Sequence, residues 1–338
     1  MLTLKPMQLA HATSRVKACS VNPIDIKVRK RVYDDFPLED FFSKRPKDDY
    51  QIIGFDAAGI VEAVGPEATR FGFKPGDSVF YCGSPIRHGS NAEFMLVSGG
   101  SVAHKPENLS FAQAAAMPLT WITAYEALVE RLDIKKGEKA ALLIVNGSGG
   151  VGSVASQIAR TILELPVVIT TTSRPETTEF SKKLGATHTV NHREDIVKQI
   201  KELKLDVPLK YVFITHSTTP YLAPAAEVLE PFGKVCSIVQ TKEMDKMYGT
   251  EFMAKSLTFV WCLLGTKPYY HVDAESHGKI LKELKELLEK GKVKCHMTQS
   301  MKLNLKGLRE AHETIEGGSQ MGKLALAVDV EGEGEAWT

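Results

Sequence analysis

A glycine-rich turn near the middle of the chain has the clearest chemistry of any segment. An apolar run at residues 142–145 precedes it, and a helical pattern begins directly after it. In this context of strand, turn and helix, a GxGxxG pattern binds the pyrophosphate of a dinucleotide, because glycines let the backbone approach and the free N–H groups at the helix start favour negative charge. The residues predicted to hold the cofactor, called the glycine turn below, are Gly147, Ser148, Gly149, Gly150, Val151 and Gly152.

The residues after the second strand predict which dinucleotide binds. An Asp or Glu about 20 residues beyond the glycines would bond the 2′-hydroxyl of NAD. Here residues 167–172 form the expected strand, and Ser173 and Arg174 follow it in place of an acid. A hydroxyl and a guanidinium suit a 2′-phosphate, so we expect NADP(H) as the cofactor. The alternative is that Arg174 is a solvated residue ahead of a helix.

The elements that must position these residues alternate between strand and helix. Expected helices cover residues 151–164, 175–184 and 221–229, and expected strands cover 167–172, 187–190, 209–214 and 233–239. This succession predicts an α/β fold class with a doubly wound parallel sheet. The first hundred residues instead hold short β-type runs between Gly and Pro turns, which predict a separate, mostly β domain. Helices at 274–290 and 305–316 and a strand at 323–328 are expected near the end.

Composition limits the class of protein. The 338 residues are 43% hydrophobic and 25% charged, with a net charge of +1, which is typical of globular proteins and gives no sign of a nucleic-acid surface. No apolar run has membrane-spanning length. The five cysteines are scattered without a CxxC pair, which favours reduced thiols. We therefore expect a cytoplasmic protein that binds neither nucleic acid nor membrane.

Several short motifs, taken in order, are similar to those of the medium-chain dehydrogenase/reductase superfamily. They stand at residues 21–29, 54–59, 74–79, 89–93 and 114–120, and the glycine turn follows them. The resemblance is greatest to the zinc-free branch of quinone oxidoreductases and zeta-crystallin, in the zinc-type alcohol dehydrogenase-like subgroup. It implies a GroES-like, mostly β catalytic domain at residues 1–117, a Rossmann domain at 118–264 and a return to the catalytic domain at 265–338.

The same resemblance implies that the zinc site is lost. Asn22 stands where zinc alcohol dehydrogenases have a cysteine ligand, and Phe55 stands where they have a histidine. Phenylalanine cannot bind a metal, and an amide is a poor replacement for a thiolate. We therefore expect no metal and no simple alcohol oxidation. Quinones and enones need less activation, and the resemblance implies that Asn22 and Thr120 line the nicotinamide and acceptor pocket. The alternatives are that Asn22 starts a turn and Thr120 caps a helix.

Other polar residues carry weaker expectations. By resemblance, Lys323 would bring a positive charge from the last strand to the cofactor phosphates. Lys182 and His192 are further candidates for the 2′-phosphate that could equally be surface charge. Tyr81, Lys27 and Arg87 are possible proton donors, and the sequence does not choose among them.

These features together predict an NADPH-dependent reductase of quinones or α,β-unsaturated carbonyl compounds. Two other functions stay open: a trans-acting enoyl reductase of a biosynthetic pathway, and a non-catalytic NADPH-binding protein like a lens crystallin. Residues 256–264 resemble the edge strand through which such enzymes form homodimers. Residues 1–14 have no clear period-two pattern, so we expect the first strand to begin near Val16 and the β domain to lack an edge hairpin.

Overall fold

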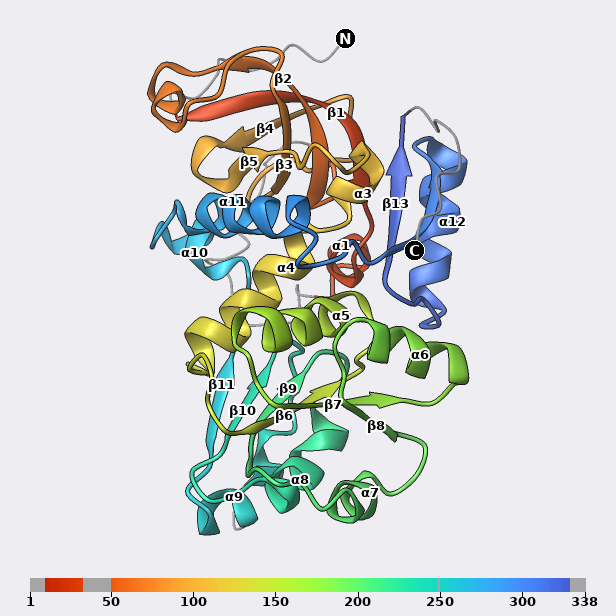
Figure 1. Cartoon of the computed structure of the whole chain (residues 1–338). Coiled ribbons are helices and arrows are strands. Elements are labelled where there is room, and N and C mark those ends of the chain that lie inside the picture. Colours follow the sequence, from red (N-terminus) through yellow and green to blue (C-terminus); the bar gives the residue numbers. More distant parts are fainter. Residues whose placement is uncertain (1–9, 33–49, 248–249, 329–338) are drawn as a thin grey trace. The chain divides into compact units, whose positions relative to one another are not determined.

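The computed structural model describes residues 10–32, 50–247 and 250–328 (Figure 1). The chain forms two compact units, each described by itself below. Unit 1 comprises Met1–Ile122 and Leu264–Thr338, and unit 2 comprises Thr123–Leu263. Within the described part of the chain, no helix is both long and apolar enough to cross a membrane.

Unit 1 is built on a sheet whose main path has the order β12-β13-β1-β2-β3-β5, and β4 pairs with β1. The pairs are antiparallel except for β12 with β13. This arrangement confirms the mostly β domain that the early part of the sequence predicts. The strands are β1 His11–Ser20, β2 Asp56–Val64, β3 Ser78–Cys82, β4 Phe94–Ser98, β5 Val102–His104, β12 Met297–Lys302 and β13 Lys323–Ala327.

The first strand is longer than its sequence suggests. β1 begins at His11, so the expected start near Val16 is wrong. The strand pairs with β2 on one side, and on the other side with β4 at its start and with β13 at its end. Pairing on both sides, and not a side-chain period, defines it as a strand. An edge hairpin before β1 would involve residues 1–9, which lie outside the described residues.

Short helices surround this sheet. They are α1 Pro23–Arg29, α3 Phe111–Ala115, α4 Pro118–Tyr125, α10 Thr266–Tyr270, α11 Ser276–Glu289 and α12 Leu305–Glu316, with 3-10 turns at Pro66–Phe71 and Gly99–Ser101. The amphipathic pattern expected at 274–290 is α11, which buries Ile280, Leu284 and Leu288. α4 continues into unit 2, where a π-helical segment follows it at Glu126–Arg131.

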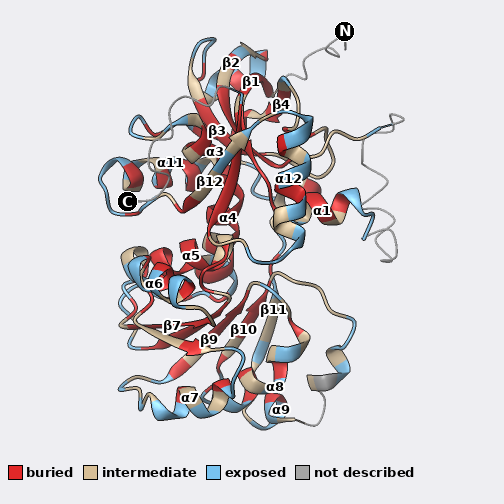
Figure 2. Ribbon diagram, turned by 90° about the vertical axis from the view of Figure 1, so that its right-hand side faces the viewer, coloured by how far each residue is buried: buried red, intermediate tan, exposed pale blue. Residues whose placement is uncertain are grey.

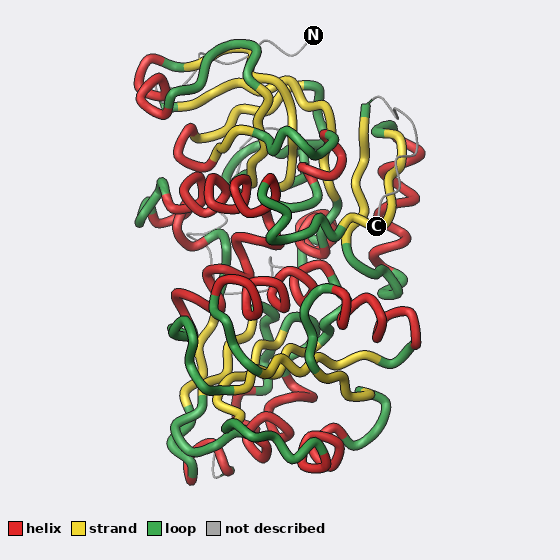
Figure 3. The backbone as a smooth tube through the Cα atoms, viewed as in Figure 1, coloured by secondary structure: helices red, strands yellow, loops and turns green. Residues whose placement is uncertain are grey.

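Unit 2 is the doubly wound parallel sheet that the alternating elements predict. The strand order is β11-β10-β9-β6-β7-β8, and α5 and α6 lie on the opposite face from α7 and α8 (Figures 1 and 3). The strands are β6 Ala141–Val145, β7 Val167–Thr172, β8 His188–Asn191, β9 Leu209–Ile214, β10 Lys234–Ser237 and β11 Thr258–Trp261. The helices are α5 Gly150–Gln157, extended by a π-helical turn at Ile158–Ile162, α6 Pro175–Lys183, α7 Ile196–Glu202, α8 Thr219–Val228 and α9 Glu251–Ala254, with a 3-10 turn at Met244–Met247.

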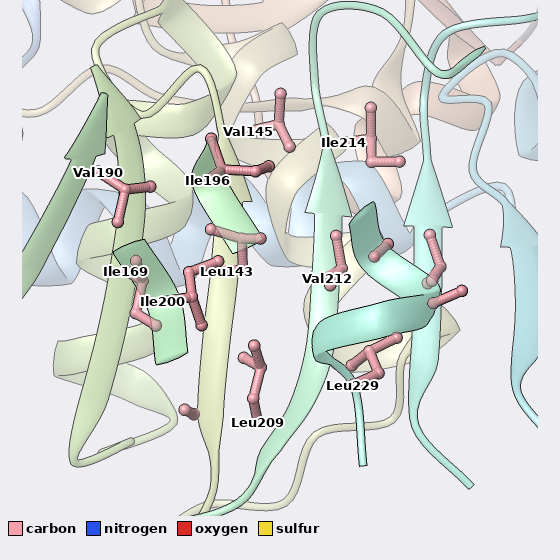
Figure 4. Close-up of a cluster of buried hydrophobic side chains, with 14 of the residues drawn as sticks. Leu143, Val145, Ile169, Val190, Ile196, Ile200, Leu209, Val212, Ile214 and Leu229 are labelled. Carbon is pink, nitrogen blue, oxygen red and sulfur yellow. The ribbon is translucent and has the colours of Figure 1, made fainter. Parts of the chain in front are cut away.

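The core of unit 2 explains why β6, its central strand, is a continuous apolar run. Every residue of β6 is buried, as expected for a parallel strand covered by helices on both faces. The neighbouring strand β7 is also buried throughout (Figure 2). Figure 4 shows Leu143 and Ile169 of adjacent strands packed with Ile196 and Ile200 of α7. Chain order reverses between β6 and β9, and ligands of such folds bind beyond the carboxyl ends of the strands at this switch point.

Candidate functional site

The glycine turn lies at the switch point of unit 2, directly after β6. Asn146 begins it with a left-handed φ of 64°, and the Asn146 N–H donates to the Thr171 hydroxyl of β7 at 2.8 Å. α5 then starts at Gly150, with Gly149 as its N-cap and no side chain bonded to the helix start. The first N–H groups of α5 are therefore not covered by a capping side chain, which suits a phosphate group.

Two glycines of the turn are required by close packing. A Cβ on Gly152 would lie 2.1 Å from the backbone oxygen of Asn146, and one on Gly147 would lie 2.3 Å from Cβ of Thr170. Neither position has room for a larger residue. The turn therefore has the cradle geometry that a dinucleotide pyrophosphate needs.

Ser173 and Arg174 lie between β7 and α6, at the same edge of the sheet. β6 and β7 are parallel neighbours, so their carboxyl ends lie side by side, and both residues are half-buried. Arg174 Nε is 3.1 Å from Glu176 Oε1, and its side chain is 39% exposed. A 2′-phosphate would thus share Arg174 with Glu176, an acid that the sequence analysis overlooked.

A buried polar network in unit 1 joins Asn22, Asp56 and Lys323. Asn22 Nδ2 donates to Asp56 Oδ2 at 2.8 Å, and Lys323 Nζ donates to Asn22 Oδ1 at 2.8 Å. Lys323 Nζ also donates to the Val21 carbonyl at 2.6 Å and lies 3.9 Å from Asp56 Oδ2. None of the three side chains is more than 4% exposed. Both ends of the Asn22 amide are therefore engaged within unit 1.

Strand register brings these side chains together. Ser20 at the end of β1 is opposite Asp56 at the start of β2, and it is also opposite Ala325 of β13. The Ser20 hydroxyl donates to Asp56 Oδ2 at 2.7 Å. At the start of α4, the Leu119 N–H donates to Asp56 Oδ1 at 2.7 Å. Asp56 thus accepts three hydrogen bonds, which is how a buried carboxyl group is normally satisfied.

Burial and charge act against each other in this network. Burial raises the pKa of Asp56, and Lys323 and the donors Asn22, Ser20 and Leu119 N–H oppose that rise. Burial lowers the pKa of Lys323, and the Asp56 and Asp25 carboxyl groups oppose that fall. Burial raises the pKa of Asp25 to about 7. Asp25 Oδ2 accepts the backbone N–H of Asn22 at 2.7 Å.

Thr120 lies in α4 next to a histidine that the sequence analysis missed. Its hydroxyl donates to the Met117 carbonyl at 3.1 Å and is 3.2 Å from His296 Nε2. Thr120 is 2% exposed and His296 is fully buried. Burial lowers the pKa of His296 to about 3, so the ring is neutral. With the Thr120 hydroxyl donating to the Met117 carbonyl, the Thr120 oxygen can accept from the His296 tautomer that is protonated at Nε2.

The structure therefore divides the expected site residues between the two units. The glycine turn, Ser173 and Arg174 belong to unit 2, and Asn22, Thr120 and Lys323 belong to unit 1. Lys323 was expected at the cofactor phosphates, and the structure places its ammonium inside the Asn22 network instead. Tyr81 was considered as a proton donor, and it is fully buried, which raises the pKa of its hydroxyl. No sequence pattern marks His296, because its contacts arise only from the fold.

The described residues around Asn22 are a poor donor set for a zinc ion. Over the described ranges, no group of three or more His, Cys, Asp or Glu could hold a metal. Phe55, the neighbour of Asp56, is apolar and buried. Burial raises the pKa of the Cys19 thiol, which keeps it protonated, whereas zinc binds thiolates.

Two family models match the chain. The Alcohol dehydrogenase GroES-like domain matches residues 10–124, and the Zinc-binding dehydrogenase model matches residues 150–294. A zinc-type alcohol dehydrogenase-like protein of Staphylococcus aureus (strain COL) is 38% identical, over 93% of this chain and 90% of the relative. The 2-methylene-furan-3-one reductase of Solanum lycopersicum is 30% identical, over 92% of this chain and 70% of the relative.

Solved structures of similar proteins also match this chain over most of its length. A Rhizobium etli protein assigned to the zinc-dependent alcohol dehydrogenases is 39% identical with a TM-score of 0.86, over 97% of this chain and 92% of that one. The Escherichia coli quinone oxidoreductase, solved with NADPH, is 25% identical with a TM-score of 0.78, over 97% and 94%. The sequence matches, the GroES-like and Rossmann-like units and the glycine turn all agree: this chain belongs to the medium-chain dehydrogenase/reductase superfamily of oxidoreductases.

Proposed function

We propose that the protein is an NADPH-dependent reductase of quinones or α,β-unsaturated carbonyl compounds that works without zinc. The observation that carries this proposal is the hydrogen bonding of Asn22, which stands at a position that the resemblance gives to a metal ligand and bonds Asp56 and Lys323 instead. Without a metal to polarise a substrate oxygen, simple alcohol chemistry lacks its activating group. Quinones and enones accept hydride with less activation because they spread the developing charge.

The cofactor part of the proposal depends on unit 2. When bound, a nicotinamide cofactor supplies the hydride. The N–H groups at the start of α5 would hold the pyrophosphate, and Ser173 and Arg174 would hold the 2′-phosphate. Directly after β7, Ser173 and Arg174 stand in place of an acid, which favours NADPH over NADH, and the Escherichia coli relative named above was solved with NADPH. The protein then contributes mainly proximity and orientation.

A panel of acceptors tests this function. Purified protein with NADPH is mixed with quinones, enones, aldehydes and ketones, and oxidation of the nicotinamide is followed by absorbance. We expect turnover with quinones or enones, slower turnover with NADH, and no loss of rate in a strong chelator. Oxidation of primary alcohols with NADP⁺ that stops on chelation would contradict the proposal.

We also propose a cytoplasmic homodimer. All five cysteines are free in the structure, which suits a reducing compartment. Among the described residues, β11 pairs with no strand other than β10 and ends the sheet of unit 2, and its Trp261 carbonyl accepts a hydrogen bond from Arg131 Nε at 3.1 Å. An open strand edge of this kind can pair with a second copy of the chain.

A further inference from the structure

Lys323 is an unusual residue because its ammonium group is buried. The side chain is 4% exposed, and a buried ammonium is tolerated only where it is hydrogen-bonded and its charge is compensated. Lys323 Nζ meets both conditions, with bonds to the Val21 carbonyl and Asn22 Oδ1 and with Asp56 Oδ2 at 3.9 Å. The ammonium is therefore a fixed part of unit 1.

Asp56 is the charge that compensates it. Its two oxygens accept three hydrogen bonds from Ser20, Asn22 and the Leu119 N–H. The Asn22 amide bridges the two charged groups, with its oxygen toward Lys323 and its nitrogen toward Asp56. This pairing fixes the orientation of the amide, because a flipped amide would place two donors together and two acceptors together.

The network disagrees with the metal that the family implies. One matching model describes a Zinc-binding dehydrogenase, and the resemblance gives the ligand positions to Asn22 and Phe55. Neither residue is a zinc ligand, and an ammonium next to Asp56 repels a divalent cation. A positive charge is nevertheless present at this place in the fold, and a lysine from β13 supplies it.

We propose that Lys323 is the built-in cation of this site: it neutralises Asp56, fixes the Asn22 amide and takes the place of a metal ion. Lys323 is thus a positioning residue. The proposal explains how Asp56 stays buried at a place where the described residues include no metal-binding group. This proposal shares with the proposed function only the premise that no zinc ion is bound. It does not depend on which acceptor the protein reduces.

A double-mutant cycle on the full chain tests the proposal. The variants are Lys323→Met, which keeps the length of the side chain, Asp56→Asn and the double variant, with Lys302→Met as a control on the exposed part of β12. We expect Lys323→Met to lower Tm by roughly 6–15 °C, because it leaves a buried carboxylate unpaired. Asp56→Asn should restore more than half of that loss, and Lys302→Met should change Tm by only about 1–2 °C. Additive losses would overturn the proposal.

The pH dependence separates a charge role from simple packing. In Lys323→Met, the unpaired Asp56 gains stability by binding a proton, so the Tm deficit should grow from pH 5 to pH 8. Asp25, Cys19, Cys82 and His296 are the other titratable groups that interact with this network, and they remain in every variant. The growth should vanish when Asn replaces Asp56. A deficit that is the same at all pH values would contradict a charge role.

Two further measurements test the proposal: the folding of the double variant and the zinc content of the protein. If Lys323→Met does not fold, the double variant must still fold and melt cooperatively, and failure of both would overturn the proposal. Protein dialysed against zinc and then buffer should hold less than about 0.1 zinc per chain by elemental analysis. One tightly held zinc, with a fall in Tm on chelation, would also overturn it. Neither result depends on the acceptor panel, so failure of the reductase function is seen separately.

Discussion

Asn22 and Thr120 show how existing hydrogen bonds limit what a residue can do. The Asn22 amide is bonded at both ends, to Asp56 and Lys323. The Thr120 hydroxyl is shared between the Met117 carbonyl and His296. Breaking such buried bonds to contact a substrate costs about 1–3 kcal/mol for each group left unpaired. We therefore expect both side chains to shape the site from within unit 1.

Arg174 is the residue that we expect to distinguish the two nicotinamide cofactors. A hydrogen bond to a charged group contributes roughly 1.5–3 kcal/mol, so Arg174→Ala should weaken NADPH binding by about ten- to a hundredfold. NADH binding should stay almost unchanged. Titration calorimetry with both cofactors measures the difference.

A variant of Glu176 tests the same contact from the other side, because the Glu176 carboxylate lies 3.1 Å from Arg174 Nε. Glu176→Gln should leave Arg174 more available and tighten NADPH binding by a few-fold. Equal losses of NADPH and NADH affinity in Arg174→Ala would show that Arg174 does not bind the 2′-phosphate.

Asp25 makes the stability of the fold depend on pH. Its folded pKa is about 7 because of burial, against an ordinary value of 3.8. The folded state therefore binds this proton more tightly, so the contribution of Asp25 to stability is present at pH 4 and is lost as the pH rises to about 7. Asp25→Asn keeps a neutral group and should raise Tm at pH 8 by on the order of 5 °C, with the gain vanishing toward pH 4.

Thermal melts between pH 4 and pH 8 check this expectation. Asp206→Asn is the matched control, because Asp206 is exposed and its replacement should leave the profile unchanged. A constant difference between wild type and Asp25→Asn across this range would mean that Asp25 is ionised throughout.

At the scale of elements, the glycine turn shows the strictest packing. β6, the turn and α5 approach so closely that a Cβ on Gly152 would lie 2.1 Å from a backbone oxygen. Backbone cannot move aside as a flexible side chain can. Gly152→Ala should therefore push α5 away from β6, lower stability by about 1–3 kcal/mol and weaken cofactor binding at least tenfold.

Urea unfolding and cofactor titration measure these two effects. Gly317→Ala serves as the control, because a Cβ there has its nearest contact at 3.4 Å and the backbone φ is −66°. It should change stability little and leave cofactor binding intact. Unchanged cofactor affinity in Gly152→Ala would show that the turn does not hold the cofactor.

At the scale of the whole molecule, the open edge of β11 decides the oligomeric state that we propose. The Thr258 N–H donates to the Gly233 carbonyl just before β10, and the Cys262 N–H donates to the Ser237 carbonyl at the end of β10. Because successive residues of a strand point alternately to either side, the Trp261 N–H faces away from β10. Trp261 is 40% exposed. Trp261→Pro removes that outward donor and should convert a dimer to a monomer.

Sedimentation of the full chain tests this prediction. Trp261→Val is the control, because it loses the ring but keeps the N–H group, and it should remain dimeric. A wild-type monomer at micromolar concentration, or a dimer of Trp261→Pro, would contradict pairing through β11.

The sequence by itself determined what depends on neighbouring residues. Residues 141–172 specify strand, glycine turn, helix and strand within one local stretch, because side-chain period and glycine geometry act over a few residues. The α/β class and the family followed from such local motifs. Strand β1 was the exception, since its start at His11 depends on pairing with β2 and β4.

Only the tertiary structure decided how the polar side chains are used. Asn22 meets Asp56 across 34 residues and Lys323 across 301, and Thr120 meets His296 across 176. No local pattern records such contacts, because they depend on strand register and on which polar groups must be satisfied once buried. Lys323 was therefore expected at a phosphate, and the fold instead places its charge beside a buried carboxyl group.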